Sequence, residues 1–267
     1  MAAITAQIVK ELRERTGAGM MDCKKALVAA DGDMELAVDN LRKSGIAKAA
    51  KKAGRTAKEG RVVVCIDGAT AAMAEVLCET DFVARNETFS GYAESLVERI
   101  VKDGHGNGDL SAAVADAERD AVTELVAKIG ENMQVRRVVR WETAGAISSY
   151  LHMGGRIGVM VDVEGDASAE LLSDICMHIA AFSPRFVTPD DIPADLVQKE
   201  QEIAAAQVEG KPEAIIEKIV MGKISKWHAE VCLMNQEWLR DDKSCLAKVA
   251  PGITVKRFER WAVGEDI

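Results

Sequence analysis

The side chains that usually carry enzyme chemistry are few and scattered in this sequence. Its four histidines are His105, His152, His178 and His228. None has a second histidine three or four residues away, the spacing that would place two metal ligands on one helix face. No stretch matches the phosphate-binding pattern G-x-x-x-x-G-K-S/T or the nucleophile pattern G-x-S-x-G. We therefore predict that the chain is not an enzyme and needs no metal or other cofactor.

The six cysteines are widely spaced and no two of them form a C-x-x-C pair. We expect reduced, mainly buried thiols, as in a cytoplasmic protein. The segment 104–108 (GHGNG) resembles a phosphate-binding loop, but it follows a predicted helix rather than a strand, so we interpret it as a flexible loop. A small-molecule enzyme would need a pocket that gathers Cys78 or His178 with carboxylates.

One short segment places a carboxylate beside a large apolar ring at a point where the chain must turn. Thr80, Asp81, Phe82 and Val83 follow a predicted strand and precede a predicted helix. In the simpler interpretation, Asp81 caps a turn and Phe82 packs into the local core. The alternative, in which the ring contacts a partner, stays open at this point.

Met20 and Met21 pose a similar choice. The apolar stripe of Cys23, Ala26 and Leu27 places Met21 on the solvent-facing side of its helix and Met20 at the margin. Exposed methionines make adaptable apolar contacts and suit a partner surface. The alternative is that both side chains pack on the rest of this chain.

Composition limits the class of partner. The chain has 267 residues and a formal net charge of −9, with 34 Lys and Arg against 43 Asp and Glu. This acidic balance argues against a protein that coats the phosphate backbone of nucleic acid. The basic stretch 48–55 has no interleaved aromatic residue, so we favour a linker over a nucleic-acid contact. No apolar stretch is long enough to span a membrane and no secretory signal is visible, which favours a cytoplasmic location.

Helical patterns dominate the start of the chain. Three short stripes are separated by turn-forming residues at 17–19, 31–33 and 44–45, which predicts a compact three-helix bundle. With its linker, this bundle occupies residues 1–55. Because so small a unit buries little surface alone, we interpret it as a recognition module.

The middle of the chain changes to strand patterns. Two hairpins, 62–78 and 147–163, are each followed by a helical pattern. Antiparallel hairpins with helices on one side favour the α+β class. We assign residues 56–140 to a first core subdomain, and 141–183 together with 230–267 to a second.

Residues 184–229 predict two helices around a break at Gly210, Lys211 and Pro212. The first of these helices has too few large apolar residues for a helix buried in a core. We therefore predict a protruding antiparallel coiled-coil hairpin inserted in the second subdomain.

Five motifs follow one another along nearly the whole chain. The most specific are residues 8–27 (IVKELRERTGAGMMDCKKAL) and 80–84 (TDFVA). Shorter matches lie at 32–37 (GDMELA), 127–132 (AKIGEN) and 155–159 (GRIGV). Together they resemble the bacterial elongation factor Ts family. The resemblance implies an N-terminal ubiquitin-associated-like (UBA-like) bundle, a two-part core and a coiled-coil hairpin.

The resemblance also implies a guanine nucleotide exchange factor for elongation factor Tu, acting during translation elongation. Such a factor needs no catalytic group, because it binds the nucleotide-free partner better than the GDP form and thereby weakens GDP binding. By the same resemblance, Asp81 and Phe82 would intrude into the partner and disturb its Mg²⁺ site, with Thr80 and Val83 positioning them.

Two further groups of partner contacts follow from the resemblance. The N-terminal module would contribute Arg13, Met20 and Met21. The second subdomain would contribute His152, Gly154 and Gly155. The competing hypothesis is a non-catalytic helical adaptor or scaffold, which would use the three-helix bundle to dock helices of other proteins.

Overall fold

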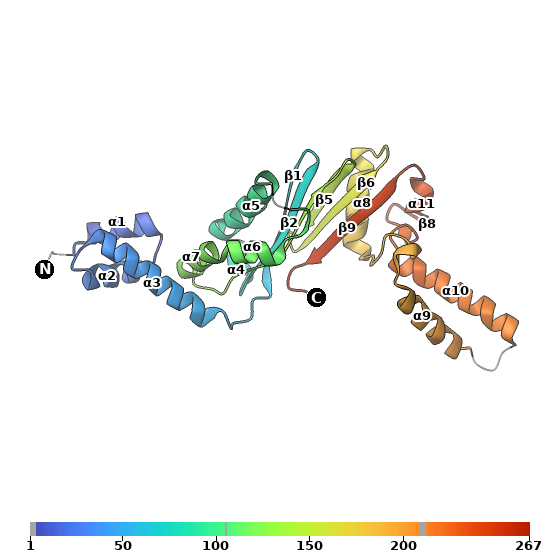
Figure 1. Cartoon of the computed structure of the whole chain (residues 1–267), viewed down its shortest axis with the longest axis horizontal. Helices are drawn as coiled ribbons and strands as arrows, with labels where there is room; N and C mark the ends of the chain where they lie inside the picture. Colours follow the sequence, from blue (N-terminus) through green and yellow to red (C-terminus); the bar gives the residue numbers. More distant parts are fainter. Residues whose placement is uncertain (1–3, 105, 209–211) are drawn as a thin grey trace.

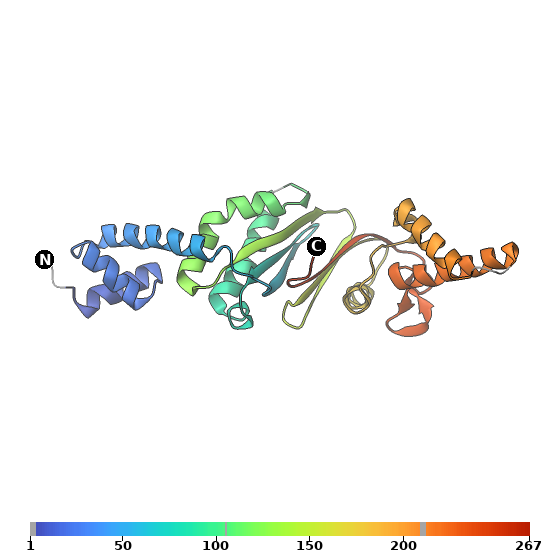
Figure 2. The same ribbon diagram turned by 90° about the horizontal axis from the view of Figure 1, so that it is seen from below.

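The computed structural model describes residues 4–104, 106–208 and 212–267. These residues form an elongated molecule, with a helical module at one end, two antiparallel sheets in the middle and a helical hairpin at the other end (Figure 1 and Figure 2). Helices pack on both sheets, so the α+β class predicted from the sequence is confirmed. No helix in these ranges combines the length and apolar character needed to cross a membrane.

Three helices form the N-terminal module. Thr5 and Asp33 precede the first and third of them and accept backbone N–H groups with their side-chain oxygens, which caps the helices. Leu12, Cys23 and Leu27 are buried in the core of the module. The helices are α1 (Ala6–Thr16), α2 (Met20–Ala29) and α3 (Met34–Lys52).

The break predicted at Ser44 and Gly45 is wrong, because α3 continues through both residues to its end at Lys52. Gly45 is buried where α3 packs on α7 (Arg119–Ile129). A Cβ at Gly45 would lie only 3.0 Å from the Cβ of Ala127. The glycine therefore permits close packing of two helices instead of ending one.

The first sheet has four strands in the order β1-β2-β4-β3, and every neighbouring pair is antiparallel. Phe89 and Leu96 are buried against strand residues that include Val76 and Val138. The strands are β1 (Glu59–Asp67), β2 (Thr70–Cys78), β3 (Gly108–Asp109) and β4 (Gln134–Glu142). The helices beside them are α5 (Glu87–Lys102), α6 (Ser111–Ala117) and α7.

The sequence pattern does not predict strand β4, because Arg136, Arg137 and Arg140 interrupt its apolar alternation. In the fold, Arg137 and Arg140 are buried. Arg137 Nε donates to Glu75 at 2.7 Å, and Arg140 Nε donates to the carbonyl of Ile100 at 3.1 Å. These long-range partners make arginine tolerable inside the sheet.

The second sheet has three strands in the antiparallel order β5-β6-β9. They are β5 (Ala146–His152), β6 (Ile157–Glu164) and β9 (Thr254–Ala262). Ile175 and Ile179 of α8 (Ala169–Phe182) belong to one buried cluster with Val161. A small unit that the sequence did not predict adds buried Trp238 and Leu246 to this cluster. It comprises β7 (Glu237–Trp238), β8 (Asp241–Cys245) and α11 (Leu246–Val249).

The two sheets pack against each other through a separate apolar cluster. Gly158 lies at this contact, and a Cβ there would come within 2.2 Å of Val62 Cγ1. Only glycine allows the strands to approach so closely. The buried members of the cluster are Val62, Ala71, Met73, Val139, Trp141, Met160 and Trp261.

A buried carboxylate also joins the two sheets. Glu75 in β2 accepts hydrogen bonds from Arg137 Nε at 2.7 Å and from the backbone N–H of Gly264, just after β9, at 2.8 Å. Arg137 also forms an ion pair with Glu265 at 2.9 Å. Because buried charges are costly unless their polar atoms are bonded, this network holds the end of β9 on the first sheet.

The helices α9 (Ala194–Ala206) and α10 (Glu213–Val231) project from the second sheet (Figure 1). At the base of the two helices, the backbones of Phe186 and Cys232 pair in an isolated parallel β-bridge. That they form a coiled coil stays a prediction. Residues 210–211 of the predicted break, and His105 of the predicted loop 104–108, lie outside the described residues.

Candidate functional site

The Thr80–Val83 segment contains the first turn of a very short helix, α4 (Asp81–Ala84), which begins three residues after the end of strand β2 at Cys78. Thr80 is the N-cap, since its Oγ1 accepts the backbone N–H of Val83 at 3.4 Å. The interpretation in which Asp81 caps the turn is therefore wrong. Asp81 lies in the first helical turn and forms an ion pair with Arg85 at 3.3 Å.

Phe82 is exposed on α4, with 83% of its surface accessible. The interpretation in which Phe82 packs into the local core is therefore wrong. The next two side chains face the protein interior: Val83 packs against the core of the first subdomain, and Ala84 is buried in it. The short helix thus turns its small side chains inward and presents its large ring to solvent. A ring this exposed contributes little to the stability of the fold and is accessible to another molecule.

The loop that carries α4 is held by a carboxylate that the sequence analysis did not single out. Glu131 accepts the backbone N–H of Glu79 at 3.1 Å, the backbone N–H of Thr80 at 3.0 Å and the hydroxyl of Thr80 at 2.6 Å. In return, Glu79 accepts the backbone N–H of Asn132 at 2.6 Å. The signal that could have found Glu131 and Asn132 is the motif 127–132, which contains both.

Cys78 and His178 do not form the reactive pocket that an enzyme would need. Burial, followed by the negative charge of Glu131, raises the pKa of the Cys78 thiol to about 12, so it stays protonated. His178 Nε2 lies 3.0 Å from Gln236 Oε1, and its Nδ1 accepts the backbone N–H of Leu239 at 3.3 Å. Burial lowers the pKa of His178, which favours the neutral ring. Both are structural groups of the core.

The described residues contain no cluster of His, Cys, Asp and Glu that could hold a metal ion.

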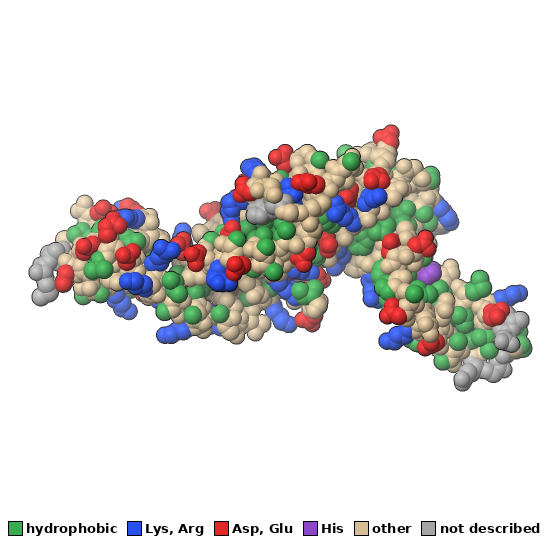
Figure 3. All heavy atoms as spheres, viewed as in Figure 1, with side chains coloured by type: hydrophobic (Ala, Val, Ile, Leu, Met, Phe, Trp, Pro, Cys, Tyr) green, Lys and Arg blue, Asp and Glu red, His purple; other side chains and the backbone are tan. Residues whose placement is uncertain are grey.

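The N-terminal module presents the predicted contact residues to solvent. Arg13 is exposed on α1, and Met20 and Met21 are 46% and 63% exposed on α2. The alternative, in which the methionines pack on the rest of the chain, is therefore wrong. On the face seen in Figure 3, apolar and charged side chains of both signs are mixed over the module.

The turn between β5 and β6 carries the third predicted group. His152 is exposed, and its Nδ1 lies 3.0 Å from the hydroxyl of Tyr150. Gly154 is exposed with a φ of 69°. Gly155 is buried, and its carbonyl accepts the backbone N–H of Val62 at 2.8 Å. Gly155 thus holds the turn on β1, which leaves His152 and Gly154 as the accessible residues.

Two of the three groups lie at the same end of β1. Arg156, next to Gly155, forms an ion pair with Glu59 at 3.0 Å. Glu59 pairs with Cys78 in the β1–β2 register, and Cys78 leads into the α4 loop. The turn after His152 and the Phe82 helix therefore flank one edge of the core, whereas Arg13, Met20 and Met21 lie on the separate helical module.

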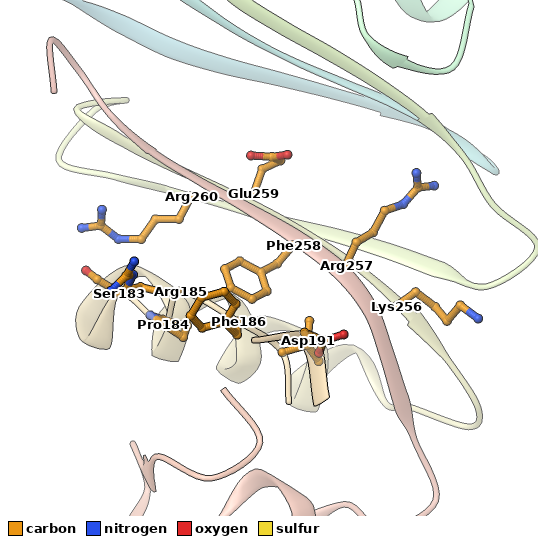
Figure 4. Close-up of a pocket in the computed structure, with 11 residues that line it drawn as sticks. Ser183, Pro184, Arg185, Phe186, Asp191, Lys256, Arg257, Phe258, Glu259 and Arg260 are labelled. Atoms are coloured by element: carbon orange, nitrogen blue, oxygen red, sulfur yellow. The ribbon is translucent and has the colours of Figure 1, made fainter. Parts of the chain in front are cut away.

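A pocket of about 460 Å³ lies elsewhere, between β9 and the segment after α8 (Figure 4). Phe186 and Phe258 point toward each other inside it, while the side chains of Arg257 and Glu259 leave the opposite face of β9. Asp191, which also lines the pocket, accepts hydrogen bonds from the backbone N–H and the hydroxyl of Thr188, each at 2.7 Å. The pocket contains none of the predicted site residues.

Comparison with known proteins points to one family. A sequence model of the family described as "Elongation factor TS" matches residues 79–265. A protein named elongation factor Ts from Thioalkalivibrio sulfidiphilus is 50% identical, over 99% of this chain and 93% of its own. Proteins of the same name from Alcanivorax borkumensis and Clostridium perfringens are 48% and 47% identical, and cover 97% and 99% of this chain and 94% of their own. These relatives include the N-terminal module that the family model leaves out.

Proposed function

The chain belongs to the elongation factor Ts family of translation elongation factors, and we propose that it releases GDP from elongation factor Tu through the exposed ring of Phe82. The observation that carries this proposal is the 83% exposure of that ring on a helix held by hydrogen bonds to Glu131. The proposal places the activity in the cytoplasm, where translation takes place.

Nucleotide exchange requires differential affinity rather than covalent chemistry. A protein that binds the nucleotide-free partner more tightly than the GDP form must weaken GDP binding by the same factor, because the two equilibria are linked. No nucleophile or proton donor is needed for this. The protonated Cys78 and the neutral, packed His178 are consistent with such a function.

Phe82 would supply binding energy by inserting its ring into the partner. Transfer of an exposed phenylalanine side chain into an apolar pocket of a partner contributes about 1.5–3 kcal/mol. Asp81, beside it, would enter the same site with its carboxylate. In nucleotide-binding proteins a Mg²⁺ ion neutralises the phosphate charge, so displacing the elements that hold the ion loosens the nucleotide. We propose that Asp81 and Phe82 act on the partner in this way.

Further contacts would keep the inserted ring in place. Arg13, Met20 and Met21 offer a charged and apolar surface on the N-terminal module, and His152 and Gly154 offer a polar turn beside β1. Separate contacts on one chain raise the effective concentration of each once another has formed. The accessible residues of all three groups would thus bind elongation factor Tu together.

The test is the rate at which labelled GDP leaves elongation factor Tu. The wild-type chain should accelerate release, and Phe82→Ala should reduce that acceleration by about tenfold, equivalent to ~1.4 kcal/mol. Met221→Ala is the matched control, since Met221 is an exposed apolar residue on α10, 72% accessible. Failure of the wild-type chain to accelerate release would overturn the proposed function.

The adaptor hypothesis rests on a different observation. The N-terminal module has its own buried core and exposes Met20 and Met21, which suits a docking surface. An adaptor would bind its partner without changing GDP release, and Phe82→Ala would have no effect. The same release measurement therefore separates the two functions.

A further inference from the structure

Three chain segments that are distant in sequence meet at Glu131 and Asn132. Glu131 holds the α4 loop through three hydrogen bonds, two from backbone N–H groups and one from the hydroxyl of Thr80. Asn132 Nδ2 donates to the carbonyl of Arg55 at 2.7 Å, in the segment that leaves the N-terminal module. We call these contacts of Glu79, Thr80, Glu131, Asn132 and Arg55 the Glu131 junction.

The junction also contacts the end of α3. The ammonium group of Lys52 donates a hydrogen bond to the carbonyl of Gly130, the residue that ends α7. A cation at a helix C-terminus is favourable because the last carbonyl groups carry partial negative charge. The last residue of α3 and the loop before Phe82 are therefore both fixed to the short connection between α7 and β4.

A helix of four residues cannot hold its own orientation. Helix formation is unfavourable until several turns have formed, so α4 depends on contacts outside itself. Val83 and Ala84 provide apolar contacts on one side. The Glu131 junction provides directional contacts at the N-terminus, because hydrogen bonds to a carboxylate are shorter and stronger than those between neutral groups.

We propose that Glu131 and Asn132 are positioning residues, which fix the Phe82 helix relative to the N-terminal module so that both meet one partner without rearrangement. The inference rests on the proposed function and assigns to this junction the preorganisation of its two contact surfaces. Preorganisation matters because ordering a loop during binding consumes part of the interaction energy.

The test uses the full chain and three substitutions. Glu131→Ala removes the acceptor for three donors, and Glu131→Gln retains one carbonyl oxygen for the two backbone N–H groups. Glu124→Ala removes an exposed carboxylate of α7, the helix that precedes Glu131, and changes the net charge as Glu131→Ala does. Two quantities are measured: the maximal rate of GDP release from elongation factor Tu, and the hydrogen exchange of the Glu79 and Thr80 amides.

Glu131→Ala should speed exchange of these two amides at least about tenfold and lower the maximal release rate by about tenfold, with amides in β2 and α5 unchanged. Glu131→Gln should recover most of both values, and Glu124→Ala should match the wild-type chain. Asn132→Ala should lower the release rate while the two amides stay protected, because it detaches the segment at Arg55 that leaves the N-terminal module and leaves the α4 loop bonded.

A merely structural role would lower thermal stability and accelerate exchange throughout the first subdomain, and that result would overturn the inference. The inference would also be overturned if Glu131→Ala leaves the Glu79 and Thr80 amides unprotected but releases GDP at the wild-type rate. If Glu131→Ala does not fold, a normal release rate for Asn132→Ala overturns it and a reduced rate supports it. If the wild-type chain itself does not accelerate GDP release, the proposed function fails and the inference fails with it. If the wild-type chain is active and only the results for the variants differ from those expected, the inference alone fails.

Discussion

Phe82 and Phe89 lie on neighbouring helices and have opposite environments. Phe89 is fully buried where α5 covers the first sheet, whereas Phe82 is exposed on α4. Both follow a short polar stretch, so their local sequence does not distinguish them. The comparison shows that one ring stabilises this subdomain and the other is free to bind.

The two rings are also held by different forces. Phe89 is held by apolar packing, which scales with buried area. The helix that carries Phe82 is held at its N-terminus by the hydrogen bonds to Glu131. Stability and the proposed partner contact therefore depend on separate residues, and substitutions should separate them.

The largest expected effect is on stability at Phe89. Phe89→Ala should lower the free energy of unfolding by about 3–5 kcal/mol, because it removes a buried ring and leaves a cavity. Urea denaturation measures this, with Phe82→Ala as the matched control. A loss below about 1 kcal/mol would mean that the core around Phe89 is not tightly packed.

A comparable loss is expected at the buried carboxylate of Glu75. Glu75→Ala removes the buried carboxylate that Arg137 of β4 contacts, leaves that guanidinium paired with Glu265 alone, and frees the backbone N–H of Gly264. Breaking a buried ion pair costs about 3–5 kcal/mol. The control is Glu94→Ala, which removes an exposed partner 3.6 Å from Arg61 and should cost at most about 1 kcal/mol. Equal losses in the two variants would contradict the role of Glu75.

At Phe82 the effect on stability should be small. Phe82→Ala should change the free energy of unfolding by no more than about 0.5 kcal/mol, since an exposed ring loses little on truncation. Phe82→Leu should retain part of the exchange activity, because leucine fills an apolar pocket less completely. Thermal melts and GDP release, measured on the same samples, check both. A large drop in melting temperature for Phe82→Ala would remove the contrast with Phe89.

The smallest effect concerns pH and the second sheet. Burial lowers the pKa of His178 below its ordinary value of about 6.5, so the folded state favours the neutral ring. As the pH falls below about 6.5 the unfolded chain binds a proton first, and stability is lost down to the pKa of the folded state. His178→Gln should flatten this dependence between pH 7 and 5. Parallel stability curves for the two chains would show that His178 does not contribute.

Much of the architecture could be predicted because its signals are local. The apolar stripe through Cys23 and Leu27 indicated a helix, and the alternation before Cys78 indicated a strand. The features that escaped depend on distant partners. Gly45 continues a helix because Ala127 packs on it, β4 tolerates Arg137 because Glu75 lies opposite, and no local pattern shows either contact.

In the candidate site, too, some features could be predicted from the sequence and others could not. Its residue types marked Asp81 and Phe82 as unusual, but the sequence left open whether the ring was buried. Only the fold shows that Thr80 rather than Asp81 caps the helix, and that Glu131 supports the loop. The first finding depends on the local backbone conformation at Thr80, whereas the second brings together residues that are far apart in the chain, which periodicity cannot do.

The order of the strands has a consequence for synthesis on the ribosome. The long strands β1, β2 and β4 belong to one continuous stretch, so the first sheet can assemble as soon as that stretch emerges. Strand β6 is made before α9 and α10, yet its second neighbour, β9, is made after them. One edge of β6 therefore stays unpaired in the nascent chain while the helical hairpin is translated, and such long-range closure is slow. The later half of the molecule is thus the half whose folding is most vulnerable to aggregation.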